Sequence, residues 1–402
     1  MNKKFYIGLI LTITILIAAE GAGAYYFYKH PIKETVTEAI NNKVYVSSET
    51  EADLEYQQLD SINKQPKNLS DVYVTGWIPD WDIPNGLSTL KDQVSIFKGV
   101  SPVWFYLEDD GSLKETPYSN GPDLTDFASS KNLDLVPSIA LFDAATISKV
   151  LNDEVLFNKH IDNIVNMAVD NNYKGIDLDY ESVYLSDKTL FFNFLKTLSQ
   201  RLKDKGKLLS FTVLPKWGDQ IDYPTLPQTR RVEDYKRISD LVDEFRIMTY
   251  DFFGRSSSQA GPVAPLKWME YVLKYAIKDG VPRDKILLGI PTYSYDWTER
   301  PLAPDDIDVI NWYGNLTPNT LENGVAYFNK QVNQVRSNYT LTEKFNSVWG
   351  EVVGTYNYKG ENRIIVFPNE DSLKLRKQLA ADYGIKGITY WRIGGEDGLK
   401  LQ

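Results

Sequence analysis

The sequence predicts an α/β fold, a (β/α)8 barrel with a small α+β insertion between its seventh and eighth strands. Short β-branched or aromatic runs alternate with amphipathic stretches after residue 70, and eight such runs can be counted. The last two are separated by about seventy residues, which is too long for a simple loop. A chain of 402 residues can hold one such barrel, an insertion and a segment that precedes them.

The barrel elements are expected in regular order along the chain. The expected strands are residues 72–79, 94–107, 133–141, 175–181, 208–214, 244–251, 286–292 and 387–392. The clearest helices, apolar at i, i+3 and i+4, are residues 145–170, 187–202, 265–279 and 371–383. The insertion covers about residues 297–370, with an expected helix at 325–335 and a hairpin of 352–358 and 363–367. Residues 71–402 are therefore one barrel domain with its insertion.

The N-terminal residues have the character of an export segment. Lys3 and Lys4 precede fifteen uncharged, mostly apolar residues. As a helix, residues 5–28 would be roughly 36 Å long, enough to cross a bilayer. We therefore expect residues 1–28 to be a membrane anchor, or a signal peptide cleaved near Ala24, and the polar residues 29–70 to be a stem. The protein is expected on the outer face of the membrane, or secreted after cleavage.

Composition excludes several kinds of chemistry. The net charge of -10 argues against a nucleic-acid partner, and the absence of cysteine removes thiol nucleophiles and thiolate metal sites. Of the two histidines, His30 precedes the fold and His160 lies in a helical pattern, where we expect it at the surface. No glycine-rich phosphate loop is present, which leaves phosphate and dinucleotide binding without support. Neither a cofactor nor a metal is expected. Carboxylates and tyrosines remain for acid-base chemistry. Aromatic residues make up 13% of the chain, and their rings can stack on sugar rings.

One expected strand, residues 175–181, carries three acids. Because side chains of a strand alternate between its faces, Asp177, Asp179 and Glu181 share one face and point into the barrel. Neighbours on that face are about 6 to 7 Å apart, so at least one carboxyl should keep its proton. Glu181 ends the strand at the mouth, where barrel enzymes hold their catalytic groups. The alternative is a polar network that only fills the barrel, but no basic or amide residue alternates with these acids.

The run Lys174-Gly-Ile-Asp-Leu-Asp-Tyr-Glu181 resembles the D-x-x-D-x-D-x-E signature of glycoside hydrolase family 18, the chitinases and their relatives. Met248-Thr-Tyr-Asp251 is similar to the M-x-Y-D element of the family, and residues 286–297 and 387–392 resemble its seventh and eighth strands. Within the family, residues 261–268 and 295–297 look most like the bacterial spore-cortex and cell-wall N-acetylglucosaminidases. Lys174 departs from the signature, which has Asp at this position.

The resemblance implies a role for each matching residue. Glu181 would protonate the glycosidic oxygen, Asp179 would orient the acetamido group of the substrate, and Asp177 would share charge and protons with Asp179. Tyr250 would donate a hydrogen bond to the acetamido carbonyl. The substrate-binding candidates are Asp251 and Met248 from the same element, and the tryptophans Trp391, Trp297 and Trp77 at or near strand ends. The alternative for the tryptophans is packing between strands and helices.

The expected function is retaining, substrate-assisted hydrolysis of β-1,4 bonds next to N-acetylglucosamine, in chitin-like or peptidoglycan glycans. Lys174 would affect the protonation of Asp177 more than the role of Glu181, so activity would be reduced or shifted in pH. Two alternatives remain, a surface-anchored chitinase-like protein that binds carbohydrate without activity and a non-catalytic envelope scaffold. The expected partners are an N-acetylglucosamine-containing polysaccharide and, through the N-terminal segment, the membrane.

Overall fold

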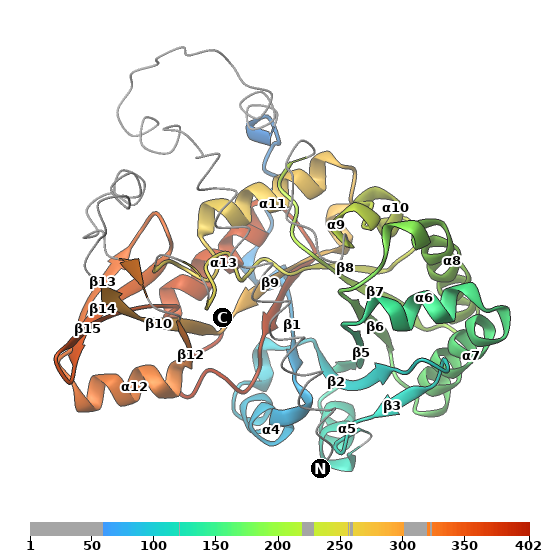
Figure 1. The fold of residues 1–402 in the computed structure, drawn as a ribbon, viewed down its shortest axis with the longest axis horizontal. Coiled ribbons are helices and arrows are strands. Elements are labelled where there is room, and N and C mark those ends of the chain that lie inside the picture. Colours follow the sequence, from blue (N-terminus) through green and yellow to red (C-terminus); the bar gives the residue numbers. More distant parts are fainter. Residues whose placement is uncertain are drawn as a thin grey trace.

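The computed structural model describes residues 59–119, 121–218, 229–255, 257, 260–300, 320–321 and 324–402. Within these ranges eight parallel strands close into a barrel, which confirms the expected fold (Figure 1). The ring closes at β1, which pairs with β16 on one side and with β2 on the other. The strands, in order around the barrel, are β1 (Tyr73–Ile78), β2 (Gly99–Leu107), β5 (Ser138–Leu141), β6 (Gly175–Tyr180), β7 (Leu208–Val213), β8 (Glu244–Ile247), β9 (Ile286–Pro291) and β16 (Gly387–Trp391).

Helices surround the barrel, and two short strands, β3 (Leu113–Glu115) and β4 (Asp134–Leu135), pair with β2. The predicted helix 145–170 is two helices, because the side chain of Asp153 accepts hydrogen bonds from the backbone N–H groups of Val155 and Leu156 and so starts a new helix. The helices are α4 (Ile83–Asp92), α5 (Pro122–Ser130), α6 (Ala144–Asn152), α7 (Glu154–Asp170), α8 (Lys188–Asp204), α9 (Thr229–Val232), α10 (Tyr235–Ser239), α11 (Leu266–Lys278) and α13 (Glu370–Asp382).

A second, antiparallel sheet lies between β9 and α13 in the chain, to one side of the barrel (Figure 1). The helix expected at 325–335 begins later, at Asn329, because residues 325–328 pair with β10 as a strand. The expected hairpin is present as β14 and β15. The elements of this region are β10 (Tyr293–Arg300), β11 (Thr320–Leu321), β12 (Val325–Phe328), α12 (Asn329–Asn338), β13 (Thr342–Asn346), β14 (Glu351–Tyr358) and β15 (Glu361–Phe367).

A buried ion pair joins the second sheet to a barrel helix. Arg376 of α13 lies 2.5 Å from Glu351 of β14, and neither side chain is exposed. The same guanidinium donates hydrogen bonds to the backbone carbonyls of Gly350 and Ala264, at 3.0 and 2.6 Å. Three segments that are distant in sequence are therefore held by one side chain.

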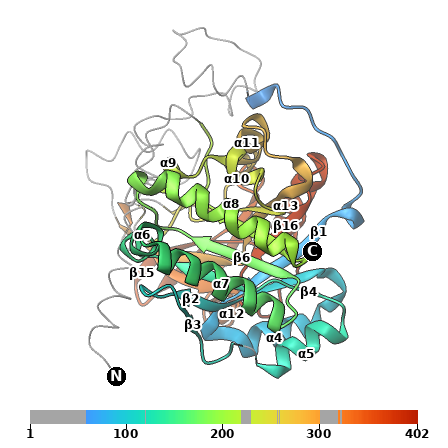
Figure 2. The ribbon, with the colours of Figure 1, turned by 90° about the vertical axis from the view of Figure 1, so that its right-hand side faces the viewer.

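The expected membrane segment, residues 1–28, lies outside the described residues, as does most of the expected stem. No helix in the described part of the chain is long and apolar enough to cross a bilayer. The last part of the stem, residues 59–68, lies against the barrel: Leu59 is fully buried, and the backbone N–H groups of Gln65 and Lys67 donate hydrogen bonds to the C-terminal end of α13. In Figure 2 this blue segment runs down the right-hand edge of the molecule.

Candidate active site

Strand β6 carries the three acids from the interior to the mouth of the barrel. Its apolar residues Ile176, Leu178 and Tyr180 are fully buried, as expected for the face that packs against helices. On the other face exposure rises along the strand. Asp177 is fully buried, Asp179 is 9% exposed, and Glu181, which follows the strand directly, is partly exposed. Glu181 is thus the most open of the three acids to a ligand at the mouth, and Asp177 is closed to one.

Hydrogen bonds surround the buried carboxyl of Asp177. Four side chains from three strands, β1, β5 and β7, donate to it: Trp77 Nε1 at 3.0 Å, Ser138 Oγ at 2.7 Å, Ser210 Oγ at 2.8 Å and Thr212 Oγ1 at 3.1 Å. Such a set of donors satisfies the lone pairs of a carboxylate and fixes its orientation. Asp177 is therefore a rigid part of the barrel interior, with no surface open to a substrate.

Asp179 lies between the other two acids. Burial raises its pKa well above the usual value, and the negative charges of Glu181, Asp177 and Glu233 raise it further. Arg246 acts in the opposite direction and does not cancel these effects. Asp179 Oδ1 has no hydrogen-bond partner among the described residues. Burial among negative charges disfavours the ionised form of this carboxyl, which agrees with the expectation that one acid of the three stays neutral.

Tyr250, which follows β8, lies next to the acids. Burial raises the pKa of its hydroxyl well above the usual value, and the nearby charges of Asp179 and Glu181 add to the shift, so the side chain remains a neutral hydrogen-bond donor. Gly289 of β9 makes room for the ring, because a Cβ at this position would lie 2.8 Å from Tyr250 Cε1. The structure thus brings together Asp177, Asp179, Glu181 and Tyr250 at one end of the barrel.

Asp251 adopts an unusual backbone conformation beside Tyr250, with φ of 58°. Positive φ in a residue other than glycine is strained and is concentrated at functional sites. The hydroxyl of Tyr293 donates a hydrogen bond to Asp251 Oδ1. Burial raises the pKa of Asp251 to about 6, although the hydrogen bond from Tyr293 favours the charged form. Asp251 is thus a partly exposed carboxyl at the mouth that titrates in the mildly acidic range.

The tryptophan candidates have different surroundings. Trp391 is partly exposed at the C-terminal end of β16 and stands edge-to-face with Trp77, the ring centroids being 6.0 Å apart. Trp77 is only 2% exposed, so it acts as a donor to Asp177 and offers no stacking face. Met248 is 7% exposed. Trp297 is fully buried against Tyr295 in β10, so the structure gives no face of Trp297 to a sugar, in contrast to our expectation.

An exposed tryptophan that the sequence analysis missed lies in the turn after β1. Trp81 is 65% exposed in the short 3-10 turn Asp80–Asp82 at the mouth. Both neighbours of Trp81 are fixed, since Asp82 forms an ion pair with Arg392 and Asp80 accepts a hydrogen bond from Tyr106. A large apolar ring on a rigid turn is suited to stacking against a sugar.

Two expectations about charged residues need correction. His160 is fully buried, not at the surface; its Nε2 lies 2.7 Å from the hydroxyl of Tyr180, and burial lowers its pKa to about 4. Arg246 of β8 lies inside the barrel, 3.6 Å from Asp177, so the acids do have a basic partner, supplied by another strand. Lys174 is exposed near Asp134, before β6 and therefore at the end of the barrel opposite the mouth.

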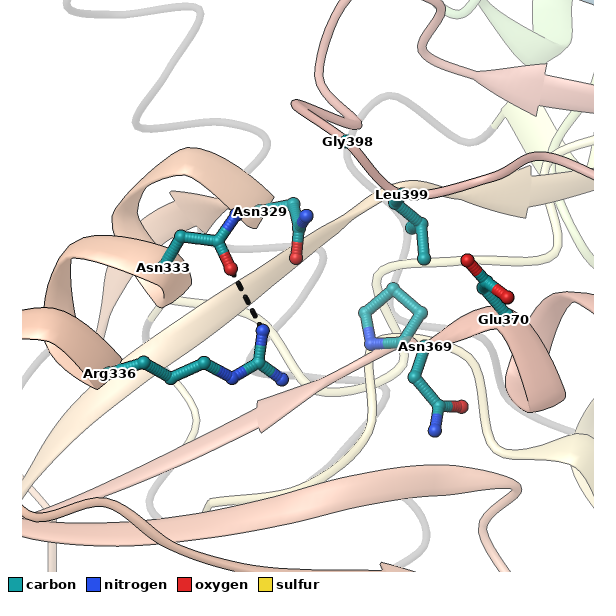
Figure 3. A pocket seen from close by; sticks show the side chains of 8 residues that line it. Asn329, Asn333, Arg336, Asn369, Glu370, Gly398 and Leu399 are labelled. Carbon is teal, nitrogen blue, oxygen red and sulfur yellow. Dashed lines mark hydrogen bonds between the residues drawn. The ribbon is translucent and has the colours of Figure 1, made fainter.

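A cavity of about 260 Å³ lies away from the acids, between α12, the start of α13 and the C-terminal segment. Figure 3 shows its polar lining, in which Arg336 donates a hydrogen bond to Asn333. Arg336 also donates a hydrogen bond to Glu343, and the side chain of Asn369 caps α13 by accepting one from the backbone N–H of Ser372. These polar groups therefore already have hydrogen-bond partners within the protein. Among the described residues no group of three or more His, Asp or Glu side chains is arranged to hold a metal ion.

The closed barrel and the acids of β6 define a glycoside hydrolase. The family model "Glycosyl hydrolases family 18" matches residues 44–396, and the chain belongs to this family. A cortical fragment-lytic enzyme of Bacillus anthracis is 27% identical over 331 residues, which cover 77% of this chain and 70% of the relative. The uncharacterized glycosylase YvbX of Bacillus subtilis (strain 168) is 24% identical over 288 residues, 71% of this chain and 76% of the relative.

Solved structures share the fold. The Bacillus cereus spore cortex-lytic enzyme SleL superposes with a TM-score of 0.66 and 23% identity, over 82% of this chain and 72% of that chain. A chitinase from Chromobacterium violaceum superposes with a TM-score of 0.69 and 21% identity, over 81% of this chain and 96% of that chain. The similarity therefore extends both to cortex-lytic enzymes and to a chitinase, and the chain lies in the cortex-lytic branch by its curated relatives.

Proposed function

We propose that this protein hydrolyses β-1,4 bonds next to N-acetylglucosamine in a cell-wall or chitin-like glycan, with retention of anomeric configuration. The observation that carries the proposal is the gradient along β6: a fully buried acid, a second acid whose pKa is raised by burial and by neighbouring charges, and a partly exposed acid at the mouth, with Tyr250 beside them. The names of the cortex-lytic relatives favour peptidoglycan as the glycan, while the chitinase fold similarity keeps chitin oligomers as substrates to be tested.

In the proposed reaction the oxygen of the substrate's 2-acetamido group attacks the anomeric carbon as Glu181 donates its proton to the leaving glycosidic oxygen. The C–O bond to the leaving sugar breaks and an oxazolinium ion forms. Asp179 and Tyr250 would hold the acetamido group in the attacking geometry. Glu181, now a carboxylate, takes a proton from water, and the hydroxide opens the ring at the anomeric carbon. The acid regains its proton and the product has the original configuration.

The experiment compares wild type with Glu181→Gln on chitooligosaccharides and on isolated peptidoglycan. General acid catalysis contributes about 10² to 10⁴ in rate, so the Gln variant should lose at least about 100-fold in kcat and still bind the glycan. Proton NMR of the first product would show the retained anomer. A wild-type protein that binds these glycans and releases no product would show a carbohydrate-binding protein instead, and an inverted anomer would contradict the acetamido mechanism.

We also propose that the protein acts outside the cell membrane, held there by residues 1–28. The support is the sequence of this segment, two lysines followed by an apolar run long enough for a bilayer. N-terminal sequencing of the mature protein tests this location. An intact N-terminus in the membrane fraction supports the anchor, whereas a new N-terminus near Ala24 in the soluble fraction shows secretion.

A further inference from the structure

Four charged side chains alternate in sign along the barrel interior, starting below Asp179. Arg246 Nη1 lies 3.6 Å from Asp177 Oδ2, and Arg246 Nη2 lies 2.8 Å from Glu244 Oε2. Glu244 Oε1 is in turn 2.8 Å from Lys386 Nζ, at the end of the barrel opposite the mouth. We call Asp177, Arg246, Glu244 and Lys386 the charge row. It connects the acids of β6 to the far end of the barrel.

Arg246 is held rigidly within this row. Its Nη1 donates a hydrogen bond to Ser101 Oγ at 2.6 Å, and its guanidinium carbon lies 5.5 Å from the centroid of the Trp77 ring. Trp77 itself donates to Asp177, so the same indole contacts both members of the ion pair. Arg246, Glu244 and Asp177 are at most 2% exposed. In such dry surroundings the charges act on one another far more strongly than at the surface.

Stability alone does not account for three charges buried in the centre of a barrel. Removing ions from water costs several kcal/mol per ion, and well-packed apolar side chains are often as stable as a buried ion pair or more stable. A role in the chemistry of the neighbouring acids accounts for the charge row better. Among the ion pairs of the described residues, Arg246 contacts one acid of β6, Asp177, and neither Asp179 nor Glu181.

We infer that Arg246 is a positioning residue of the acid site: it fixes the negative charge on Asp177 and thereby leaves the proton on Asp179. Without Arg246, only the hydrogen-bond donors around Asp177 would stabilise its negative charge, and Asp177 would take a larger share of the proton. With Arg246, the carboxylate that touches the guanidinium is Asp177. Asp179 then carries the proton beside Glu181 and Tyr250, where a substrate would bind. This role rests on the proposed function for its kinetic consequences.

The direction of the pKa shifts supports this assignment. Burial lowers the pKa of Arg246, but Asp177 and Glu244 outweigh burial and raise it, so Arg246 stays charged. Burial raises the pKa of Glu244, and the cations Arg246 and Lys386 together bring it below its usual value. The other titratable groups that face the row are Tyr73, which is in the field of Glu244, Asp134 and Arg246, and the acids Glu181 and Glu233 near Asp179.

Two variants should move the pH dependence in opposite directions. Arg246→Met removes a positive charge next to the acids, which raises their pKa values and should move the profile of kcat/KM against pH upward by roughly one unit. Glu244→Gln leaves the positive charge of Arg246 less compensated, so the profile should move downward. Arg246→Lys should restore most of the wild-type profile. A purely structural role would lower activity in both variants without moving their profiles apart.

The controls separate this effect from misfolding. Arg336→Met makes the same change in net charge at the exposed Arg336–Glu343 pair and should leave the profile in place. If Arg246→Met does not fold, the double variant Arg246→Met/Glu244→Gln takes its place, because it also removes the acid that Arg246→Met leaves unpaired. Its profile of kcat/KM against pH should still move upward, since Arg246 is nearer to Asp177 than Glu244 is. Profiles of Arg246→Met and Glu244→Gln that coincide with wild type, or that move in the same direction, would overturn the proposal.

A measurement without substrate keeps this inference distinct from the proposed function. Infrared difference spectra between each protein and its Asp179→Asn counterpart report the protonated carboxyl of Asp179 directly. In wild type this band should persist through neutral pH, and in Arg246→Met it should be a smaller share of the whole protonated-carboxyl signal, because Asp177 also takes up a proton. If wild type cleaves no glycan, the proposed function is wrong, and this spectrum still decides the role of Arg246. A band that is unchanged in Arg246→Met would contradict the inference.

Discussion

The indole nitrogen of Trp77 donates a hydrogen bond to Asp177 over 3.0 Å, from the first strand of the barrel to the strand that bears the acids. The same ring stands edge-to-face with Trp391 of the last strand. One buried side chain therefore connects the innermost acid to the partly exposed tryptophan at the mouth.

Trp77→Phe should remove the donor while an aromatic ring remains. Leaving a buried acceptor with one hydrogen bond fewer costs about 1 to 3 kcal/mol, so the free energy of unfolding should fall by this amount and kcat/KM by roughly tenfold. Denaturant unfolding and steady-state kinetics measure the two effects. Trp104→Phe is the matched control, because Trp104 is equally buried and its Nε1 has no hydrogen-bond partner among the described residues. Equal losses of kcat/KM in both variants would contradict the prediction.

Trp81→Ala should weaken binding of long glycans without loss of stability. The ring is 65% exposed, so its removal should change the free energy of unfolding by less than about 0.5 kcal/mol. A stacked sugar ring would lose about 0.5 to 1.5 kcal/mol, which raises KM roughly 2- to 10-fold for oligomers long enough to reach the turn. Val155→Ala, at an exposed apolar residue of α7, is the control. Kinetics across a series of oligomer lengths tests this; an effect of the same size on the shortest substrate would disprove the stacking role.

Asp251→Asn should change how stability depends on pH. The pKa of Asp251 is raised to about 6 in the folded state, from an ordinary value of 3.8. The folded protein therefore binds the proton more tightly than the unfolded chain, and the stability that this contributes is complete below about pH 4 and is lost as the pH rises through 6. The free energy of unfolding of wild type minus that of Asp251→Asn should therefore fall by about 1 to 3 kcal/mol from pH 4 to pH 7.

The measurement is denaturant unfolding at several pH values. Asn is well suited here because it tolerates the positive φ of this position, so the backbone need not change. Tyr293→Phe is a useful companion, since it removes the hydrogen bond that favours the charged form and should move the loss of stability to higher pH. A constant difference between wild type and Asp251→Asn across this range would show that Asp251 does not titrate as expected.

Arg376→Met should destabilise the protein strongly, because it leaves the buried carboxylate of Glu351 without its partner. Breaking a buried pair costs about 3 to 5 kcal/mol, and Arg376→Met/Glu351→Leu should recover most of that loss. The comparison is Arg336→Met at the exposed Arg336–Glu343 pair, where the loss should be at most about 1 kcal/mol. Urea unfolding curves give all three values, and a double variant as unstable as the single one would contradict this account of the pair.

Alternation along strands was sufficient to predict the acid site. The face shared by Asp177, Asp179 and Glu181 follows from the two-residue period, and the hydrogen bonds of Asp177 with side chains of β1, β5 and β7 confirm that this face points into the barrel. The same period places Glu244 and Arg246 on one face of β8. We missed their role because they meet Asp177 only through the pairing of strands around the barrel, which no local pattern shows.

Other features depend on tertiary context. Trp297 follows the seventh strand, as a mouth residue would, but β10 leads away into the second sheet, where the ring is buried. Trp81 was overlooked because it lies in a turn beyond the strand, where Asp82 pairs with the distant Arg392. The break before α7 carried a local signal, since an Asp precedes the helix and caps it.

The segment 59–68 has a mechanical consequence. It contacts the C-terminal end of α13, Arg283 ahead of β9 and Lys386 ahead of β16, and its Asp60 forms an ion pair with Lys274 of α11. A pull on the chain before residue 59 would be carried by these helix ends and not by the strands that hold the acids. Such a load would therefore pass behind the barrel and leave the acids at the mouth in place.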